Sequence, residues 1–128
     1  MAQTDRRLRE KEAEDAMEEW RERREQLAEE LRIAQRARAL LAALEQRLKD
    51  KDRSDLQEHL GHLDRFAQPL PEEHFVWLLV DDAIKHAMTR GAGKAGSVAS
   101  RCRSKCEGRI SRLEGIIERE DALASKEE

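Results

Sequence analysis

The chain has 128 residues, enough for one domain with a modest core, and 41% of them are charged while only 3% are aromatic. The formal net charge is −3. No apolar run approaches the roughly 20 residues that a bilayer span requires, so we expect no membrane-spanning segment. Ala, Glu, Arg and Leu dominate the composition, as they do in long helices and coiled coils, so we expect an all-α fold.

The N-terminal segment, residues 1–50, predicts one long helix. The first sixty residues contain neither glycine nor proline, and the helical pattern is unbroken from Thr4 to Asp50. A helix of that length measures roughly 70 Å at about 1.5 Å per residue, longer than a domain of this size is wide. We therefore expect a coiled-coil-like arm in the first part of residues 1–50.

The apolar face of this helix changes along its length. A thin seam with alternating spacings of three and four residues runs up to Leu31, and from Ile33 a second apolar line widens the face. The wide part suits packing within the chain, whereas the thin part suits a single partner helix. The predicted partner-facing anchors, for a second copy of the chain or another helical protein, are Met17, Trp20, Leu27 and Leu31.

Residues 51–124 predict three further helices that pack on the Leu40–Leu48 end of the first. A capping-box pattern begins at Ser54, and the second helix then runs to about Ala67. Pro71, followed by two glutamates, suits the first turn of a third helix, which we expect to be the buried centre. A strand over Phe75–Val80 is the alternative for this apolar run, because short apolar runs are ambiguous by period alone.

A glycine-rich segment separates the third and fourth predicted helices. Gly91 suits the end of the third helix, and residues 90–96 are expected to form a flexible connection. Ser97 or Ser100 would then cap the fourth helix, whose apolar face continues through Ile117. The tail, residues 125–128, is expected to fray.

Two motifs resemble ligand sites without meeting their requirements. The segment from Gly91 to Ser97 has a lysine after a glycine, but alanine replaces the hydroxyl residue that a phosphate-binding loop needs, so an interhelical linker is the expectation. His59, His62, Cys102 and Cys106 together hold the right donors for zinc. Both cysteines, however, lie on the apolar stripe of the fourth helix, and core packing is the expected role. We predict no metal and no cofactor.

Catalysis has no support in the pattern of polar residues. No serine or cysteine lies in the strand-turn-helix elbow that is typical of an activated nucleophile. Asp81 and Asp82 are adjacent in sequence, so their side chains point apart on a helix and cannot act as a catalytic pair. We therefore predict a protein without enzymatic activity and without a small-molecule substrate.

The charge distribution is uneven, and its basic part is a candidate for nucleic-acid binding. Residues 83–112 carry eight basic groups and one acidic group, whereas the rest of the chain is acidic. Phosphate contacts from such a segment would give salt-sensitive, sequence-tolerant binding. The alternative is pairing with the acidic 51–82 region or with an acidic partner. The candidate phosphate-binding residues are Arg90, Lys94, Arg101, Lys105 and Arg112.

The sequence thus favours a helical oligomerisation or adaptor protein that mediates assembly through its N-terminal coiled coil. An oligomeric DNA- or RNA-binding accessory protein is the alternative function. The charged N-terminus has no apolar core of a secretory signal, and the two closely spaced cysteines suit a reducing compartment. A cytoplasmic location is expected.

Overall fold

The computed structural model describes residues 2–50, 55–89 and 92–126. Four helices make up almost all of these residues: α1 (Ala2–Lys49), α2 (Leu56–Ala67), α3 (Phe75–Thr89) and α4 (Ala92–Lys126). No strand occurs within the described ranges, so the all-α prediction is confirmed and the strand alternative for Phe75–Val80 is wrong. None of the helices described is long and apolar enough to cross a bilayer.

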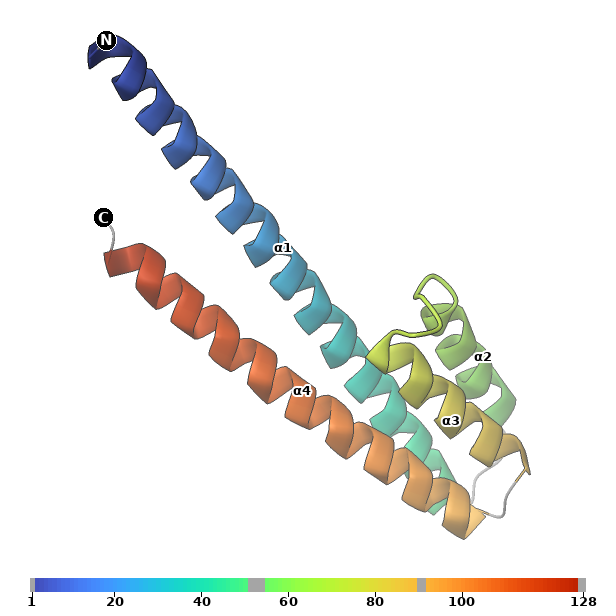
Figure 1. The fold of residues 1–128 in the computed structure, drawn as a ribbon. Coiled ribbons are helices and arrows are strands. Elements are labelled where there is room, and N and C mark those ends of the chain that lie inside the picture. The colour runs from blue at the N-terminus through green and yellow to red at the C-terminus, as the bar shows by residue number, and fades with distance from the viewer. Residues whose placement is uncertain (1, 51–54, 90–91, 127–128) are drawn as a thin grey trace.

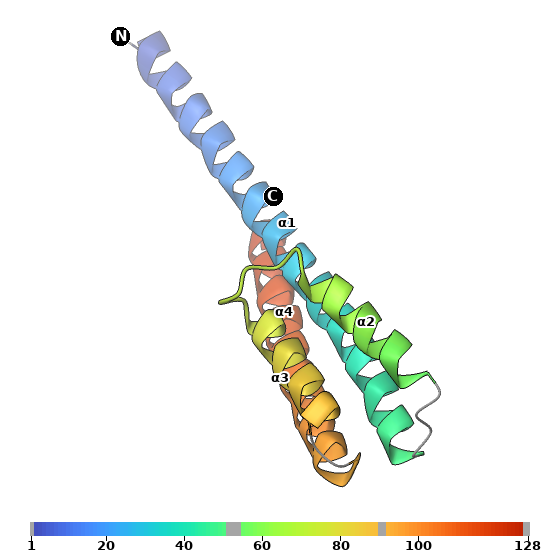
Figure 2. The same ribbon diagram turned by 90° about the vertical axis from the view of Figure 1, so that its right-hand side faces the viewer.

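The two long helices, α1 and α4, form an antiparallel pair that is the axis of the molecule (Figure 1). The two short helices, α2 and α3, pack together beside the C-terminal half of α1 (Figures 1 and 2). Helix α3 also contacts α4, whereas α2 does not. The result is a four-helix bundle at one end and a two-helix stalk at the other.

The hydrophobic core lies where all four helices run side by side. The widening of the apolar face of α1 after Ile33, predicted from the sequence, coincides with the start of this core, because a second apolar line allows the helix to contact more than one neighbour. Small residues let the backbones of α1 and α4 approach, and larger side chains fill the space between layers. The residues least exposed to solvent are Ala37, Leu41, Leu44, Val80, Ala99 and Cys106.

Helix α1 confirms the prediction of one long N-terminal helix. It spans 48 residues, from Ala2 to Lys49, within two residues of the expected bounds. The absence of glycine and proline removes every internal stop signal, so the helix continues until the chain turns toward α2. Ser54, the first residue of the predicted capping box, lies outside the described residues.

Helix α3 begins at Phe75, four residues later than the sequence pattern indicated. The segment after Pro71 forms a separate turn, closed by a hydrogen bond from the backbone N–H of His74 to the carbonyl oxygen of Pro71. The imidazole Nδ1 of His74 then accepts a hydrogen bond from the backbone N–H of Val76 at 3.0 Å. The side chain of His74 therefore caps α3, which begins at Phe75. The sequence had suggested that the helix begins at Pro71.

Helix α4 begins at Ala92, so the prediction of a flexible connection through Gly96 and a serine cap is wrong. Gly93 and Gly96 are both helical, and the Ser97 hydroxyl bonds back to the carbonyl oxygen of Gly93. Burial of Ala95 in the core offsets the cost of two helical glycines, about 1 kcal/mol each relative to alanine. Gly91, the predicted end of α3, lies outside the described residues.

The early start and unbroken course of α4 give it 35 residues, roughly 50 Å of helix. It therefore extends along α1 well beyond the Leu40–Leu48 end, to which the sequence had confined the packing of the three later helices. The apolar stripe of α4 continues through Leu113 to Ile117, which are buried, and this stripe holds the extension against α1.

Candidate functional site

Ion pairs at two levels along the stalk and bundle mark the alignment of α1 with α4: Arg23 with Glu120 and Arg24 with Asp121 at one level, and Glu45 with Arg103 at the other. Near the open end of the stalk, the Arg24 Nε lies 3.0 Å from the Asp121 Oδ1. Near the bundle, the Arg103 Nε lies 2.5 Å from the Glu45 Oε2. Residue 24 of α1 is therefore level with residue 121 of α4, and the two helices keep one antiparallel alignment between these points. This alignment determines which part of α1 is covered by the chain itself.

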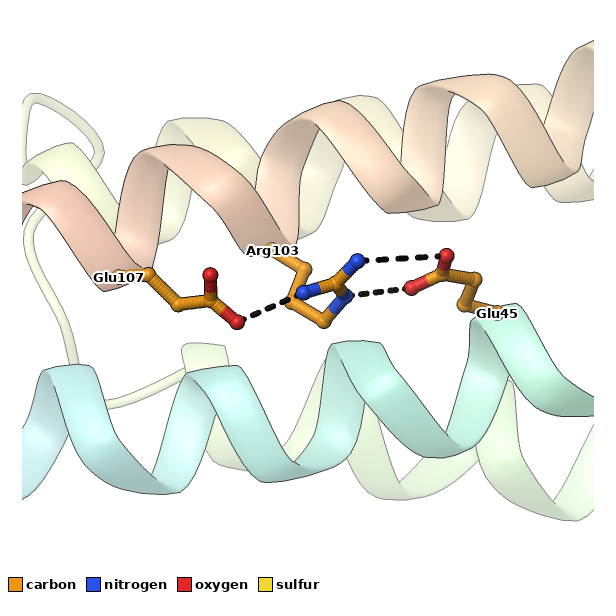
Figure 3. A network of polar contacts seen from close by, with 3 residues as sticks. All are labelled: Glu45, Arg103 and Glu107. Carbon is orange, nitrogen blue, oxygen red and sulfur yellow. Dashed lines mark hydrogen bonds and ion pairs between the residues drawn. The ribbon is translucent and has the colours of Figure 1, made fainter.

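The pair near the bundle is part of a three-residue network (Figure 3). The Arg103 guanidinium lies between the helices and donates to Glu45 on α1 and, at 2.6 Å, to Glu107 on α4. The hydrogen bond from Arg103 holds the pKa of Glu45 below its ordinary value, and the bond to Glu45 raises the pKa of Arg103. Both groups are therefore held in their charged forms, as a clamp between α1 and α4.

The N-terminal part of α1 extends beyond the end of α4 (Figures 1 and 2). We call residues 6–19 of α1 the overhang; every one of them is exposed to solvent. Two large apolar side chains lie there, Leu8 with 53% and Met17 with 55% of its surface exposed. The overhang lacks most of the tertiary packing that normally stabilises a helix in a protein. A charged helix of this length is only marginally stable alone in water.

An apolar notch lies where α4 ends beside α1. Its volume is about 590 Å³, and more than half of its lining is apolar. Half-buried Trp20 lines it from α1, and Leu123, with 60% of its surface exposed, lines it from α4. The notch is lined by Ala13, Ala16, Met17, Trp20, Glu120, Leu123 and Ala124. It lies between α1 and the last two turns of α4.

The four predicted anchors fall in two different places. Met17 and Trp20 lie at the notch, where Met17 is exposed and Trp20 is half-buried. Leu27 and Leu31 are half-buried in the part of α1 that runs beside α4, between the Arg24 ion pair and the core. Because α4 of the same chain already lies there, the surface that remains open to a partner consists of the overhang and the notch.

The predicted basic segment is divided by the structure into paired and open groups. Lys85 pairs with Asp81 on its own helix at 2.8 Å, and Arg103 is held in the network described above. The Arg109 guanidinium lies over the Phe75 ring, 5.7 Å from its centroid. Pairing with the acidic 51–82 region is thus limited to Lys85 within the described part of the chain. Arg90 lies outside the described residues.

The open basic groups form one line on α4, which we call the cation stripe: Lys94, Arg101, Lys105 and Arg112. At 100° per residue, these positions fall within about 40° of one another around the helix and span about 27 Å along it. All four side chains are exposed, and none forms an ion pair with another described residue. The spacing of these four residues, seven or four positions apart, can be read from the sequence. The sequence does not show that they form no ion pair with another described residue.

The zinc alternative is not supported by the positions of its donors. His59 and His62 lie on α2, whereas Cys102 and Cys106 lie on α4, and these two helices do not touch. Both cysteines are free thiols buried in the core. Among the described residues, no group of three or more potential ligands is arranged to hold a metal ion.

His74 is a structural residue that sequence reasoning did not identify. Its Nε2 lies 3.0 Å from a carboxylate oxygen of Glu30 on α1, while its Nδ1 caps α3. Since Nδ1 accepts a hydrogen bond, the ring proton is on Nε2 and is donated to Glu30. His74 thus links the start of α3 to the middle of α1. Its sequence context, three residues after a proline, carries no signal of this contact.

Two surfaces therefore remain as candidates for function: the overhang with its notch, and the cation stripe. They lie on different parts of the molecule. The notch lies beside the last turns of α4, whereas the cation stripe begins in the first turns of α4. Comparison of the chain with known protein families, curated proteins and solved structures gives no match.

Proposed function

We propose that this protein is a non-enzymatic helical assembly protein, which joins a further helix through the overhang and the notch. The observation that supports this function is the open apolar notch at the end of the stalk, with Met17 and Leu123 exposed in a chain of which 41% of the residues are charged. A helix laid along the overhang would cover these side chains and extend the α1–α4 groove. The partner is a second copy or another helical protein.

The energetics of the overhang favour the same function. Isolated helices shorter than about 12–15 residues are marginal in water, and most helical stability in proteins comes from packing. Met17 and Trp20 continue the apolar seam to the notch, where Met17 is exposed and Trp20 is half-buried beside the last turns of α4. A partner helix would supply the missing packing. The buried free thiols of Cys102 and Cys106 suit a reducing compartment, so we place this assembly in the cytoplasm.

Substitution at the notch tests the proposal. Two differently tagged copies of the full chain are expressed in the native source, and one tag is purified. We expect a protein partner, either the second tagged copy or another polypeptide, to be retained by the wild type and lost with Met17→Glu combined with Leu123→Glu. Leu78→Glu, on an exposed leucine of α3, is the matched control and should retain the partner. Equal recovery with all three proteins would exclude the notch as the assembly surface.

Nucleic-acid binding is the second candidate function, and the cation stripe is the specific observation that favours it. A straight line of four exposed cations, none of which forms an ion pair with another described residue, can follow a phosphate backbone. The described part of the segment offers no exposed aromatic side chain for stacking on bases, so the contacts would be to phosphates and tolerant of sequence.

The salt dependence of binding to a DNA or RNA duplex tests this second candidate. Four phosphate contacts predict an affinity that falls about 100-fold between 50 and 200 mM salt. Exchange of all four stripe residues for glutamine should abolish the binding. A control variant of equal charge carries glutamine at four exposed arginines elsewhere, Arg21, Arg36, Arg38 and Arg65, and should bind several-fold more tightly than the stripe variant. No retardation of either nucleic acid at 50 mM salt would leave an acidic protein as the partner of the stripe.

A further inference from the structure

The overhang is divided into two oppositely charged halves. Residues 6–11 carry four basic groups and one acidic group, whereas residues 12–19 carry five acidic groups and no basic one. Both halves belong to the helix α1, and all fourteen side chains are exposed. Only Arg6 and Glu10 form an ion pair among the described residues of the overhang, and that pair lies within the basic half. Apart from Arg6 and Glu10, the charged groups of the two halves thus have no ion-pair partner among the described residues.

This charge order is complementary to itself when the helix is reversed. If two copies align their overhangs antiparallel about a two-fold axis, the basic half of each lies beside the acidic half of the other. A parallel alignment would place like charges side by side and would be repelled. The overhang therefore distinguishes between the two orientations of a helix pair, as charged flanking positions do in coiled coils.

The end of α4 adds a second complementary contact. Helix α4 runs antiparallel to α1, so an overhang from a second copy that is also antiparallel would follow the same line, with its N-terminus meeting the C-terminal end of α4. The last turns of α4 are acidic, with six acidic and two basic groups in residues 113–128, and a helix C-terminus carries partial negative charge. The basic, dipole-positive tip of the second overhang matches it.

The apolar contacts are limited, which determines the strength of the pair. Two overhangs of 14 residues would lie together over roughly 20 Å, and each would cover the Met17 and Leu123 edge of the other copy's notch. Such a contact covers less than the roughly 800 Å² per partner of a standard stable interface. Charge attraction must then contribute a large share, so the association should be weak and sensitive to salt.

We propose that the partner of the overhang is a second copy of this chain, paired antiparallel, tip to notch, through the opposite charges of residues 6–11 and 12–19. This inference rests on the proposed assembly function and specifies its partner, orientation and driving force. The notch of each copy is closed by the other, and the two bundles lie at opposite ends of a continuous helical stalk.

Sedimentation of the full-length protein at tens of micromolar tests the pairing without any substitution. We expect a dimer at 50 mM salt whose dissociation constant rises at least about 10-fold at 500 mM salt. A monomer at both salt concentrations would overturn the proposal. A dimer that strengthens with salt would also overturn it, because a parallel or purely apolar pair would behave in that way.

Two charge-swapped chains test the complementarity. One carries glutamate at Arg6, Arg7, Arg9 and Lys11, and the other carries lysine at Glu12, Glu14, Glu18 and Glu19. Each should be monomeric alone, and an equimolar mixture should recover a dimer at 50 mM salt. Circular dichroism should show both to be folded, because the substituted side chains lie outside the core. A mixture that stays monomeric would contradict charge pairing of the overhangs.

These experiments distinguish failure of the antiparallel pairing of two copies from failure of the proposed assembly function. If the pure wild type is monomeric at 50 mM salt, yet a different polypeptide is captured by the wild type and lost with the Met17→Glu and Leu123→Glu variant, the assembly function stands and the second copy is overturned as its partner. If neither is found, both are overturned.

Discussion

Replacement of Leu41 with alanine is expected to lower the free energy of unfolding by about 3 kcal/mol. Leu41 has no solvent exposure and lies in the core, so its truncation removes apolar contacts and leaves a cavity. Measured losses for buried leucines are about 2–5 kcal/mol. Small domains are stable by only about 5–15 kcal/mol, so this single change should shift the denaturant midpoint markedly.

A matched leucine on the surface provides the control. Leu78 on α3 is 53% exposed, and Leu78→Ala should change the unfolding free energy by less than about 0.5 kcal/mol. Urea titrations at one fixed protein concentration give both values, since an associating protein would otherwise change its apparent stability with concentration. Similar losses in the two variants would mean that the four helices do not share the core described above.

The helical architecture was predictable because its determinants are local. α1 has no breaker over its whole length, and α2 ends where prolines follow. The change of the α1 face near Ile33 likewise depends only on apolar spacing, and it coincides with the start of the core. Where neighbouring residues decide conformation, the sequence and the structure agree.

The start of α4 was not predictable because tertiary packing outweighs a local preference there. Gly93 and Gly96 read as a linker, since each weakens a helix by about 1 kcal/mol. In the fold, Ala95, Val98 and Ala99 between and after them are buried, and a Cβ atom placed on Gly96 would lie in van der Waals contact, 4.0 Å from the Leu48 Cβ across the pair. Helical burial of these neighbours therefore decides the conformation, and no pattern within the segment itself reveals it.

The candidate site was predictable only in part, for a related reason. The seam from Met17 to Leu31 predicts a helix partner, but spacing does not tell whether that partner belongs to the same chain. In the fold, the part of α1 that holds Leu27 and Leu31 runs beside α4, as the pairing of Arg24 with Asp121, 97 residues apart, shows, while Met17 stays exposed. The split of the basic segment depends equally on contacts with distant residues, such as that of Arg103 with Glu45.

Alkaline pH is expected to destabilise the protein through its buried thiols. Burial, followed by the nearby Cys102 and Glu107, raises the pKa of Cys106 from its ordinary value of 9.0 to about 11. The unfolded thiol ionises near pH 9, while the folded thiol stays neutral, so the unfolded state binds fewer protons in this range. The free energy of unfolding therefore falls as pH rises, by about 2 kcal/mol between pH 9 and pH 11 from this group.

Cys106→Ala should flatten this decline, whatever its effect at neutral pH, because alanine cannot ionise. Cys102→Ala is the matched control: burial also raises the pKa of Cys102, but Lys105 and Arg101 oppose the rise, so its removal should flatten the profile less. The other ionisable groups are the same in all three proteins, so their effects cancel in the comparison. Urea unfolding at several pH values from 8 to 11 measures the slopes. Parallel profiles for the wild type and Cys106→Ala would show that this thiol is accessible to water in the folded state, contrary to its burial in the core.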